Sequence, residues 1–450
     1  MTTTPQARPA RGDELELTVD SLAHGGNGVA RRDGYVVFVA GAVPGDRVRA
    51  VVGRAKRAYA EARAVEVLDP SPDRIPAAAE HPGAAWQVLP YERQLEVKAG
   101  LVGEALERIG RLEGFELEPI VPAVEQWRYR NKLEYSFGTG AGGELVCGFH
   151  APGRWDEIVS MEDCLLASER SNAVREQVLA WCRAQGLTAW DRREQHGLLR
   201  NLVIREGRRT GELQVRLVTS PGRIDADSLV GAVACDGLFW TQQEQLGEST
   251  LGGETVLLSG TPQLRERLGG LDFLVSPEAF FQTNTEMAER LYGIAAELAG
   301  LRGTERVFDL YCGIGTIALM LAARAREVVG VEIVEAAVAD AIENARLNDV
   351  LNARFYAGDI RLAMRDLVEQ AGRPDVAVVD PPRSGLSQKV VRRILEARPS
   401  RVVYVSCNPT TLAPNAAQMV EAGYRLVRVR PVDMFPQTPH IECVALLERG

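Results

Sequence analysis

The chain has 450 residues, 46% of them hydrophobic and 25% charged, which is the composition of an ordinary soluble globular protein. No apolar run approaches the roughly 18 residues of a membrane helix, and the polar N-terminus lacks a signal-peptide core, so we expect a cytoplasmic protein without membrane partners. Seven scattered cysteines without a CxxC pair argue against both a disulfide framework and a zinc site. The net charge of −9 excludes a uniformly basic nucleic-acid binder, but it leaves local basic patches for RNA.

The first predicted unit spans residues 13–70. Its short alternating runs, LELTV, YVVFVA and RVRAVV, are separated by glycine-rich and Pro-Gly-Asp turns, and this pattern predicts a small β-barrel. Residues 26–30 (GNGVA), the aromatic strand 35–39 and residues 44–46 (PGD) resemble a TRAM domain, a small RNA-binding barrel. Basic residues outnumber acidic ones between residues 46 and 63, which fits either an RNA contact or a solvated face.

The second predicted unit, residues 71–275, begins with a proline-rich linker. A helix is predicted over residues 91–110, because apolar residues recur there at helical spacing and Gly110 can end it. The rest reads as a mixed, strand-rich region that we expect to bind RNA. Residues 127–132 (WRYRNK) interleave aromatic and basic side chains, a combination that suits stacking and phosphate contacts.

The third predicted unit, residues 276–450, alternates strictly between helix and strand. Such alternation predicts a doubly wound, mostly parallel sheet of the Rossmann-like α/β class. The last two strands, over residues 425–431 and 440–447, follow each other without a helix, so we expect them to form an antiparallel edge.

A nucleotide-type site is predicted at the end of the strand over residues 305–310. Residues 313–318 (GIGTIA) fit a glycine-rich loop that lets a ligand approach the next helix, and Glu332 ends the following strand where it could bind a ribose. Both NAD and S-adenosylmethionine carry an adenosine ribose. Asp309, before the glycines, favours S-adenosylmethionine, because a carboxylate suits the ammonium of its methionine and repels a pyrophosphate.

Two further strand ends carry reactive side chains. The strand over residues 401–406 delivers Cys407, followed by Asn408 and Pro409, to the edge of the sheet where ligands bind. A thiol there is either a nucleophile or a small buried hydrophobe. The fourth strand ends in residues 380–383 (DPPR), a carboxylate in a tight turn that resembles the catalytic motif of class I methyltransferases.

Together these motifs resemble the S-adenosylmethionine-dependent uracil-5 RNA methyltransferase family. The resemblance rests on residues 280–284 (FFQTN), 380–383 (DPPR), 406–409 (SCNP) and 433–442 (DMFPQTPHIE), in that order, and it extends over nearly the whole chain. It implies that Cys407 is the nucleophile, that Glu442 is the base, and that S-adenosylmethionine is held by Gln282, Tyr311, Glu332 and Asp380. His440, two residues before Glu442, would share its strand face and help to position Glu442 or the RNA; the role of Thr316 stays open.

The chain departs from many relatives in one respect. Those relatives hold an iron–sulfur cluster with four cysteines, three of them before a segment like residues 86–95, whereas residues 77–85 (AAAEHPGAA) contain no cysteine here. Cys164, near the position expected for the fourth ligand, is left without partner cysteines. Because thiolates hold such clusters, we predict that this chain carries none and needs no metal.

Several functions remain open at this point. The leading one is methylation of C5 of a uridine in 23S ribosomal RNA, because the tRNA-specific branch of the family commonly lacks the barrel; a tRNA uridine is the second, and a cytosine target is disfavoured. A non-catalytic RNA-binding assembly factor would not require Cys407 and Glu442. An NAD oxidoreductase would explain neither Cys407 nor the DPPR motif. No obligate protein partner is indicated.

Overall fold

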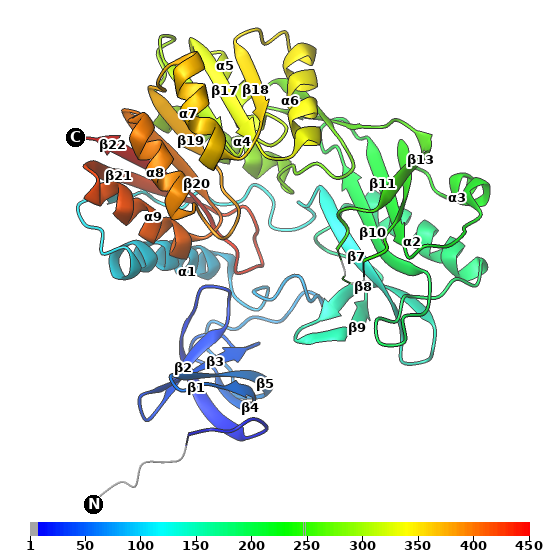
Figure 1. Ribbon diagram of the computed structural model, residues 1–450. Coiled ribbons are helices and arrows are strands. Elements are labelled where there is room, and N and C mark those ends of the chain that lie inside the picture. The colour runs from blue at the N-terminus through cyan, green and yellow to red at the C-terminus, as the bar shows by residue number, and fades with distance from the viewer. Residues whose placement is uncertain (1–7, 246, 248) are drawn as a thin grey trace, which may run out of the picture.

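The computed structural model describes residues 8–245, 247 and 249–450 and has three parts (Figure 1). An N-terminal barrel lies below the long helix α1 (Tyr91–Glu104), a central sheet lies to one side, and a C-terminal α/β sheet lies above the helix. Within the described residues, no helix is long and apolar enough to cross a membrane.

The barrel is closed by five strands in the order β1-β2-β3-β5-β4. They are β1 (Glu14–Leu22), β2 (Gly28–Arg32), β3 (Tyr35–Ala40), β4 (Arg47–Ala55) and β5 (Tyr59–Asp69). Alternate residues of β1 (Leu15, Leu17 and Val19) point into the barrel core, as the two-residue period of the sequence requires. The buried carboxylate of Asp46 accepts hydrogen bonds from the Ser71 backbone and from Arg74, so it ties the start of the linker to the barrel.

The central part is a seven-stranded sheet in the order β13-β12-β11-β10-β7-β8-β9. Its strands are β7 (Lys132–Thr139), β8 (Leu145–Ala151), β9 (Arg154–Ser160), β10 (Leu199–Glu206), β11 (Leu213–Thr219), β12 (Gly237–Gln242) and β13 (Glu254–Gly260). Two helices, α2 (Glu169–Ala184) and α3 (Ala226–Ala232), pack with it and share its apolar core. The alternating runs in the sequence predict the strands at β7, β8, β10, β11 and β13, but neither helix was expected.

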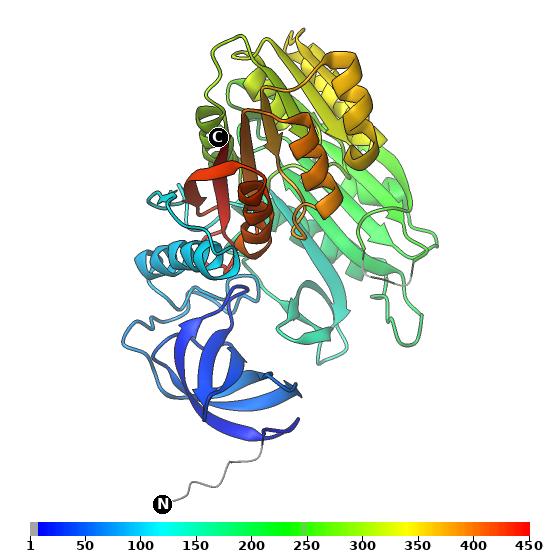
Figure 2. The ribbon, with the colours of Figure 1, turned by 60° about the vertical axis from the view of Figure 1, so that its left-hand side comes forward.

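The C-terminal part is an eight-stranded sheet in the order β18-β17-β16-β19-β20-β22-β21-β6. Its strands are β6 (Glu116–Leu117), β16 (Arg306–Leu310), β17 (Glu327–Glu332), β18 (Ala353–Ala357), β19 (Val376–Val379), β20 (Arg401–Ser406), β21 (Tyr424–Val432) and β22 (Glu442–Arg449). In Figure 2 this part lies above the cyan helix α1, and the blue barrel lies below that helix. Helices α4 (Thr285–Ala299), α5 (Thr316–Ala322) and α6 (Glu335–Leu347) cover one face, and α7 (Ile360–Ala371), α8 (Gln388–Ala397) and α9 (Pro409–Glu421) cover the other. The predicted fold class, a doubly wound and mostly parallel sheet with a barrel and a mixed central region, is confirmed.

The last two strands pair antiparallel as expected, but they do not form the edge of the sheet. Strand β22 is inserted between β20 and β21 and runs antiparallel to both. The edge itself is β6, a two-residue strand from a distant part of the sequence that pairs parallel with β21. The final strand is therefore buried inside the sheet, and its first residue, Glu442, lies beside the end of β20.

Parts of the expected middle unit pack with the C-terminal sheet. Val102 of α1, Leu106 of the π-helical turn η1 (Ala105–Ile109) and the nearby Leu112 belong to the core under α8 and α9. The hairpin of β14 (Leu264–Leu268) and β15 (Leu271–Val275) belongs to the core under α4. The packing thus places residues 91–121 and 264–275 on the C-terminal part rather than on the central sheet.

The topology gathers the predicted site residues. Strand β16 lies between β17 and β19. The chain runs from β16 to β17 and β18 on one side of it and then crosses to β19 and β20 on the other side, so the strand order reverses at β16. In open α/β sheets ligands bind at the carboxyl ends of the strands beside such a reversal. Asp309 lies near the end of β16, and residues 311–315, 380–383 and 407 follow strands at this edge.

Candidate active site

Cys407 lies at the carboxyl end of β20, immediately before α9. Asn408 caps α9 because its side chain accepts a hydrogen bond from the Thr410 backbone at 3.1 Å, and Pro409 occupies the first turn of the helix. The strand before Cys407 is buried, whereas the cysteine itself is half-buried. The buried strand β20 holds the backbone before Cys407, and the capped start of α9 holds it after, so the thiol is positioned at the edge of the sheet.

Glu442 lies beside Cys407 through the register of the two strands. Antiparallel pairing places Ser406 opposite Cys443, so the next residue outward on each strand, Cys407 or Glu442, lies at the same edge. Burial raises the pKa of Glu442 well above its ordinary value, and the negative charge of Asp380 acts in the same direction. A carboxylate in this position is a stronger base than an exposed one.

The Cys407 thiol is protonated at neutral pH in the free protein. Burial, followed by the charges of Glu442 and Asp380, raises its pKa to about 11, while the positive charge of Arg383 acts in the opposite direction. Because the thiolate is the nucleophilic form, the balance between the two carboxylates and the guanidinium controls the reactivity of this cysteine.

Arg383 connects three segments of the site. Its guanidinium lies 3.2 Å from Nδ1 of His440, and its carbonyl accepts a hydrogen bond from the Asn408 side chain at 3.1 Å. A guanidinium has no acceptor, so Nδ1 of His440 accepts and the ring proton of the neutral imidazole is on Nε2. Burial and the charge of Arg383 lower the pKa of His440 to about 4, which keeps it neutral.

The position of His440 differs from the expected one. Strand β22 begins at Glu442, so His440 precedes the strand and does not share a strand face with the glutamate. Its side chain is directed to Arg383 and lies edge-on to Phe435, with 6.1 Å between the ring centroids. His440 therefore belongs to the mouth of the site.

The predicted cofactor residues lie along the neighbouring strand ends. Glu332 accepts hydrogen bonds from the backbone N–H groups of Gly313 at 3.2 Å and of Ile333 at 2.8 Å, so the glycine loop and the acidic strand end are held together. Tyr311, just before the glycines, has a left-handed backbone with φ 73°. Gln282 is buried, and its carbonyl accepts a hydrogen bond from Asn131 of the central part at 2.9 Å.

The sequence is similar to RNA methyltransferases over nearly its whole length. Residues 270–450 match the tRNA (uracil-5-)-methyltransferase family, and residues 9–65 match the TRAM domain. The chain is 38% identical to an uncharacterized RNA methyltransferase of Halalkalibacterium halodurans, with 98% of each protein covered, and 38% identical to another of Porphyromonas gingivalis, with 96% of this chain and all of the relative covered. The chain belongs to the uracil-5 RNA methyltransferase family.

A solved structure resembles the whole methyltransferase. It is the tRNA (uracil-54, C5)-methyltransferase of Pyrococcus abyssi in complex with S-adenosyl-L-homocysteine, with a TM-score of 0.79 and 29% sequence identity over 96% of this chain and 99% of that one. The protein is thus an S-adenosylmethionine-dependent RNA methyltransferase with an RNA-binding TRAM domain, as the sequence predicts.

The residues at the sheet edge of the methyltransferase suit S-adenosylmethionine. Asp309 on β16 is fully buried, and its carboxylate oxygens make no well-formed hydrogen bond among the described residues, although the Ala318 backbone N–H lies close enough to oppose the rise of its pKa. Burial and the charge of Asp380 raise the pKa of Asp309 to about 8. A buried carboxylate without partners is costly unless a cation pairs with it, and the ammonium group of the methionine portion would supply that cation.

Tyr292 and His24 belong to the surroundings of the site but were not identified from the sequence. Tyr292 of α4 is buried, and burial, followed by the charges of Asp380 and Glu442, raises its pKa, so Tyr292 lies near both carboxylates. His24, in the loop between β1 and β2, has its pKa lowered by burial and by the charge of Arg383. Tyr292 reads as a core residue of an apolar helix and His24 as a turn residue, so neither carries a sequence signal.

The region that holds a cluster in many relatives contains His81 and Cys164. Nε2 of His81 lies 3.2 Å from Sγ of Cys164, and both side chains are buried. Among residues 8–245, 247 and 249–450, no group of three or more His, Cys, Asp or Glu side chains could hold a metal ion. The absence of an iron–sulfur cluster stays a prediction, which the iron content of anaerobically purified protein would test.

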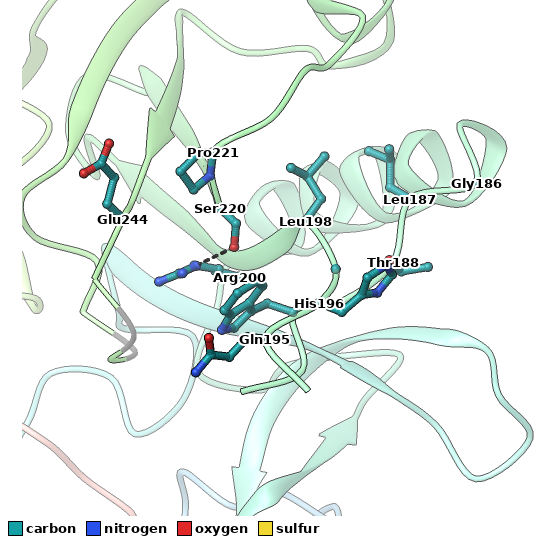
Figure 3. Close-up of a pocket in the computed structure, with 12 residues that line it drawn as sticks. Gly186, Leu187, Thr188, Gln195, His196, Leu198, Arg200, Ser220, Pro221 and Glu244 are labelled. Atoms are coloured by element: carbon teal, nitrogen blue, oxygen red, sulfur yellow. Dashed lines mark hydrogen bonds between the residues drawn. The ribbon is translucent and has the colours of Figure 1, made fainter. Parts of the chain in front are cut away.

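One hollow of the methyltransferase lies away from the predicted site. It has a volume of about 490 Å³ and is lined by residues 186–188, Trp190, residues 195–198, Arg200, Ser220, Pro221 and Glu244 of the central part (Figure 3). Arg200 stacks on Trp190 with its guanidinium carbon 4.7 Å from the ring centroid and donates a hydrogen bond to Ser220. None of the predicted catalytic or cofactor residues lines this hollow.

Proposed function

We propose that the protein methylates C5 of a uridine in RNA by covalent catalysis, with Cys407 as the nucleophile and Glu442 as the base. The observation that carries this proposal is the strand register, which brings Cys407 at the end of β20 next to a buried carboxylate with a raised pKa. C5 of uracil is a weak nucleophile on its own. Addition of a thiolate to C6 makes C5 electron-rich, which is the chemical reason for a cysteine here.

Each residue then has a defined task. The Cys407 thiol gives its proton to solvent, and the thiolate forms a bond to C6 of a uracil that has left its stack, while the electrons of the C5–C6 double bond move to C5 and the O4 carbonyl. S-adenosylmethionine supplies the methyl group that C5 takes up. Glu442 removes the proton from C5, the C5–C6 double bond forms again, and the bond between C6 and Sγ of Cys407 breaks. The guanidinium of Arg383 favours the thiolate at the first and last steps.

We propose that the cofactor is held by the residues expected from the sequence, together with Asp309. Glu332 would accept hydrogen bonds from the ribose, and Asp309 would pair with the ammonium. Gln282, Tyr311 and Asp380 would line the rest of the pocket. Support comes from the buried, unpartnered carboxylate of Asp309 and from the Glu332 carboxylate, which already fixes the loop at Gly313.

A trapping experiment tests the mechanism. RNA that contains 5-fluorouracil cannot lose a proton from C5, so incubation with S-adenosylmethionine should leave a covalent complex that survives a denaturing gel. Cys407→Ala should form no complex. Glu442→Gln should accumulate the corresponding adduct with ordinary RNA, because the C5 proton stays in place. The covalent mechanism is wrong if the intact protein methylates ordinary RNA but forms no adduct with the 5-fluorouracil RNA.

The substrate is proposed to be 23S ribosomal RNA, with tRNA as the second candidate. The expectation of ribosomal RNA rests on the barrel. The Pyrococcus abyssi enzyme, however, is named for tRNA and matches 96% of this chain, so the barrel alone does not separate the two substrates. Mapping 5-methyluridine in ribosomal RNA and tRNA from cells with and without the gene decides between them, since the modification disappears only from the true substrate.

A further inference from the structure

A second cavity lies where the central sheet meets the C-terminal part. It has a volume of about 460 Å³ and is bounded by β7 and β10 of the central sheet and by the segment that leads into α4. Cys407, Glu442 and the predicted cofactor residues do not line it. Its walls carry three cations, Arg130, Lys132 and Arg205, against a single carboxylate, Glu134, and an aromatic ring at the rim, Phe280.

Arg205 is the deepest of these cations. Its side chain is only 3% exposed, Nη2 donates a hydrogen bond to the Ala279 carbonyl at 2.7 Å, and Nη1 has no hydrogen-bond partner among the described residues. Nε of Arg130 is likewise buried and without a partner in the described part of the chain. Leaving buried guanidinium N–H groups unpaired is costly, and an anion in the cavity would satisfy them.

The carboxylates of Glu134 and Asp340 offset only part of the positive charge around Arg205, because the cavity walls hold three cations against one carboxylate. Glu134 is already paired with Lys132 at 2.6 Å and accepts a hydrogen bond from Thr250 at 2.8 Å. Arg216 lies close enough to Arg205 that its charge helps burial to lower the pKa of Arg205 to about 10. The cavity therefore has an excess of positive charge, and its cations are largely shielded from water. A phosphate binds more strongly in such an environment than at an open surface.

The rim adds a surface for a base. Phe280 is 67% exposed, although it lies next to the buried Phe281 and Gln282. An exposed aromatic ring beside a cluster of cations is the arrangement that proteins use to bind single-stranded nucleic acid, with the base on the ring and the phosphate on the cations.

Contacts connect this cavity to the candidate active site. The Arg130 guanidinium, which lines the cavity, lies 5.3 Å from the ring centroid of Phe435. Phe435 contacts His440. Nδ1 of His440 accepts a hydrogen bond from Arg383, which lies near Cys407. A strand of RNA with one base at Cys407 could therefore continue along these side chains into the cavity.

We propose that this cavity binds a nucleotide that neighbours the target uridine in the substrate RNA, with its phosphodiester on Arg205 and Arg130 and its base on Phe280. The inference rests on the proposed function, because it assumes that RNA enters the site at Cys407. It assigns the cavity the task of holding the strand while the target base is out of its stack.

The test compares two variants of the cavity with an exposed control. RNA from cells lacking the gene is methylated by the full-length protein, and the KM for RNA and kcat are measured at several salt concentrations. Arg205→Gln should raise the KM for RNA at least about tenfold and make the dependence of log KM on log salt shallower by roughly 0.7 to 0.9, the value for one phosphate contact. Phe280→Ala should raise the KM by about tenfold with no change in that slope.

An exposed control variant and the affinity for S-adenosylmethionine separate a loss of RNA binding from a general loss of structure. Arg108→Gln removes the same charge from a side chain that is 77% exposed on η1, and it should leave all constants unchanged. The Kd for S-adenosylmethionine should stay the same in every variant, which shows that the fold is intact; if Arg205→Gln fails to fold, Phe280→Ala, on the surface, still decides. An active wild type with unchanged KM in both variants overturns this inference alone. A wild type that transfers no methyl group overturns the proposed function instead.

Discussion

The thiol of Cys407 lies among two carboxylates and one guanidinium, and its reactivity depends on their balance. Arg383→Gln removes the positive charge that lowers the pKa of the thiol, so the pKa should rise above its value of about 11. The rate of alkylation by iodoacetamide as a function of pH measures this shift, because the reagent attacks the thiolate. At any one pH below the pKa, the variant should react several-fold more slowly than the wild type, because a smaller fraction of its Cys407 is thiolate.

Two further variants provide the comparison for Arg383. Glu442→Gln removes a negative charge next to the thiol, so it should lower the pKa of Cys407 and speed alkylation. Arg392→Gln removes a charge from a side chain that is 62% exposed on α8 and should leave the alkylation profile unchanged. Equal profiles for all three variants would mean that these charges do not control the thiol.

Asp309 should lower the stability of the free protein and strengthen the binding of the cofactor. Its pKa is about 8 in the folded protein against 3.8 for an unperturbed aspartate, so ionisation opposes folding as the pH rises from the lower value through the higher one. Asp309→Asn should therefore leave the free protein at least as stable at pH 8. The same variant should bind S-adenosylmethionine at least about tenfold more weakly, since it loses a buried ion pair.

The pH dependence separates this role of Asp309 from a general disturbance of the pocket. In the wild type, the ammonium of the cofactor requires the carboxylate, so the Kd measured by calorimetry should increase as the pH falls below about 8. In Asp309→Asn that increase should disappear. A variant that keeps the wild-type pH dependence would show that another group holds the ammonium.

At the scale of elements, helix α1 is fastened to the segment that precedes β22. Nζ of Lys98 lies 2.6 Å from Asp433, and both side chains are fully buried. Lys98→Met leaves the carboxylate of Asp433 buried without its cation, which should lower the free energy of unfolding by about 3 to 5 kcal/mol. Denaturant titration measures this change. The exposed pair of Arg93 and Glu96 on the same helix is the control, and Arg93→Met should cost less than about 1 kcal/mol.

A double variant shows whether the loss comes from the unpaired charge. Lys98→Met combined with Asp433→Asn removes both charges, so it should be less destabilised than the sum of the two single variants. Strict additivity would mean that the pair contributes nothing as a pair. Because residues 433–441 lead directly to Glu442, we also expect the single variants to lower kcat more than they raise the KM for RNA.

The elements differ in how far the sequence could predict them. Buried parallel strands such as β20 read as continuous apolar runs, so the alternation of the C-terminal sheet was clear from the sequence. Strand β6 has only two residues, too few to show an alternation of apolar and polar side chains. It is a strand because it pairs with β21. Helix α2 begins at the cap residue Ser168 and keeps Val174 and Val178 at helical spacing, so its signal was present although the surrounding strands obscured it.

Only part of the candidate site could be predicted from the sequence. Cys407 and Glu442 could be named from motifs, because each motif is local. The contact of Arg383 with His440, the missing partners of Asp309 among the described residues and the approach of His24 depend on residues far apart in the chain. The burial of Lys98 was equally hidden, since a lysine in a helix reads as a solvated residue until its partner 335 positions away is known.

At the scale of the whole molecule, the barrel reaches the mouth of the candidate site through the loop between β1 and β2. Gly26 in this loop has φ +90°, and a Cβ placed there would lie 2.6 Å from Cβ of Pro439 and 3.1 Å from Nε1 of Trp86. No side chain fits between these atoms without moving the barrel. The glycine thus sets how closely an RNA-binding domain docks against the segment that contains His440.

Gly25 offers a matched control for this docking. It has the same φ of +90°, but a Cβ there would meet no atom within 4 Å. Gly25→Ala and Gly26→Ala therefore share the backbone strain, and only Gly26→Ala adds the clash. Displacing the barrel lowers the effective concentration of RNA at the catalytic domain, so Gly26→Ala should raise the KM for RNA about tenfold while Gly25→Ala stays within about twofold of the wild type.

Small-angle scattering and cofactor binding complete this comparison. Gly26→Ala should have a larger radius of gyration than Gly25→Ala, because the barrel moves away from Pro439 and Trp86, whereas both variants should bind S-adenosylmethionine as the wild type does. If the two alanine variants have the same KM and the same radius, the close contact at Gly26 does not position the RNA. If only Gly26→Ala loses affinity for RNA, the barrel and the catalytic residues hold the substrate as one surface.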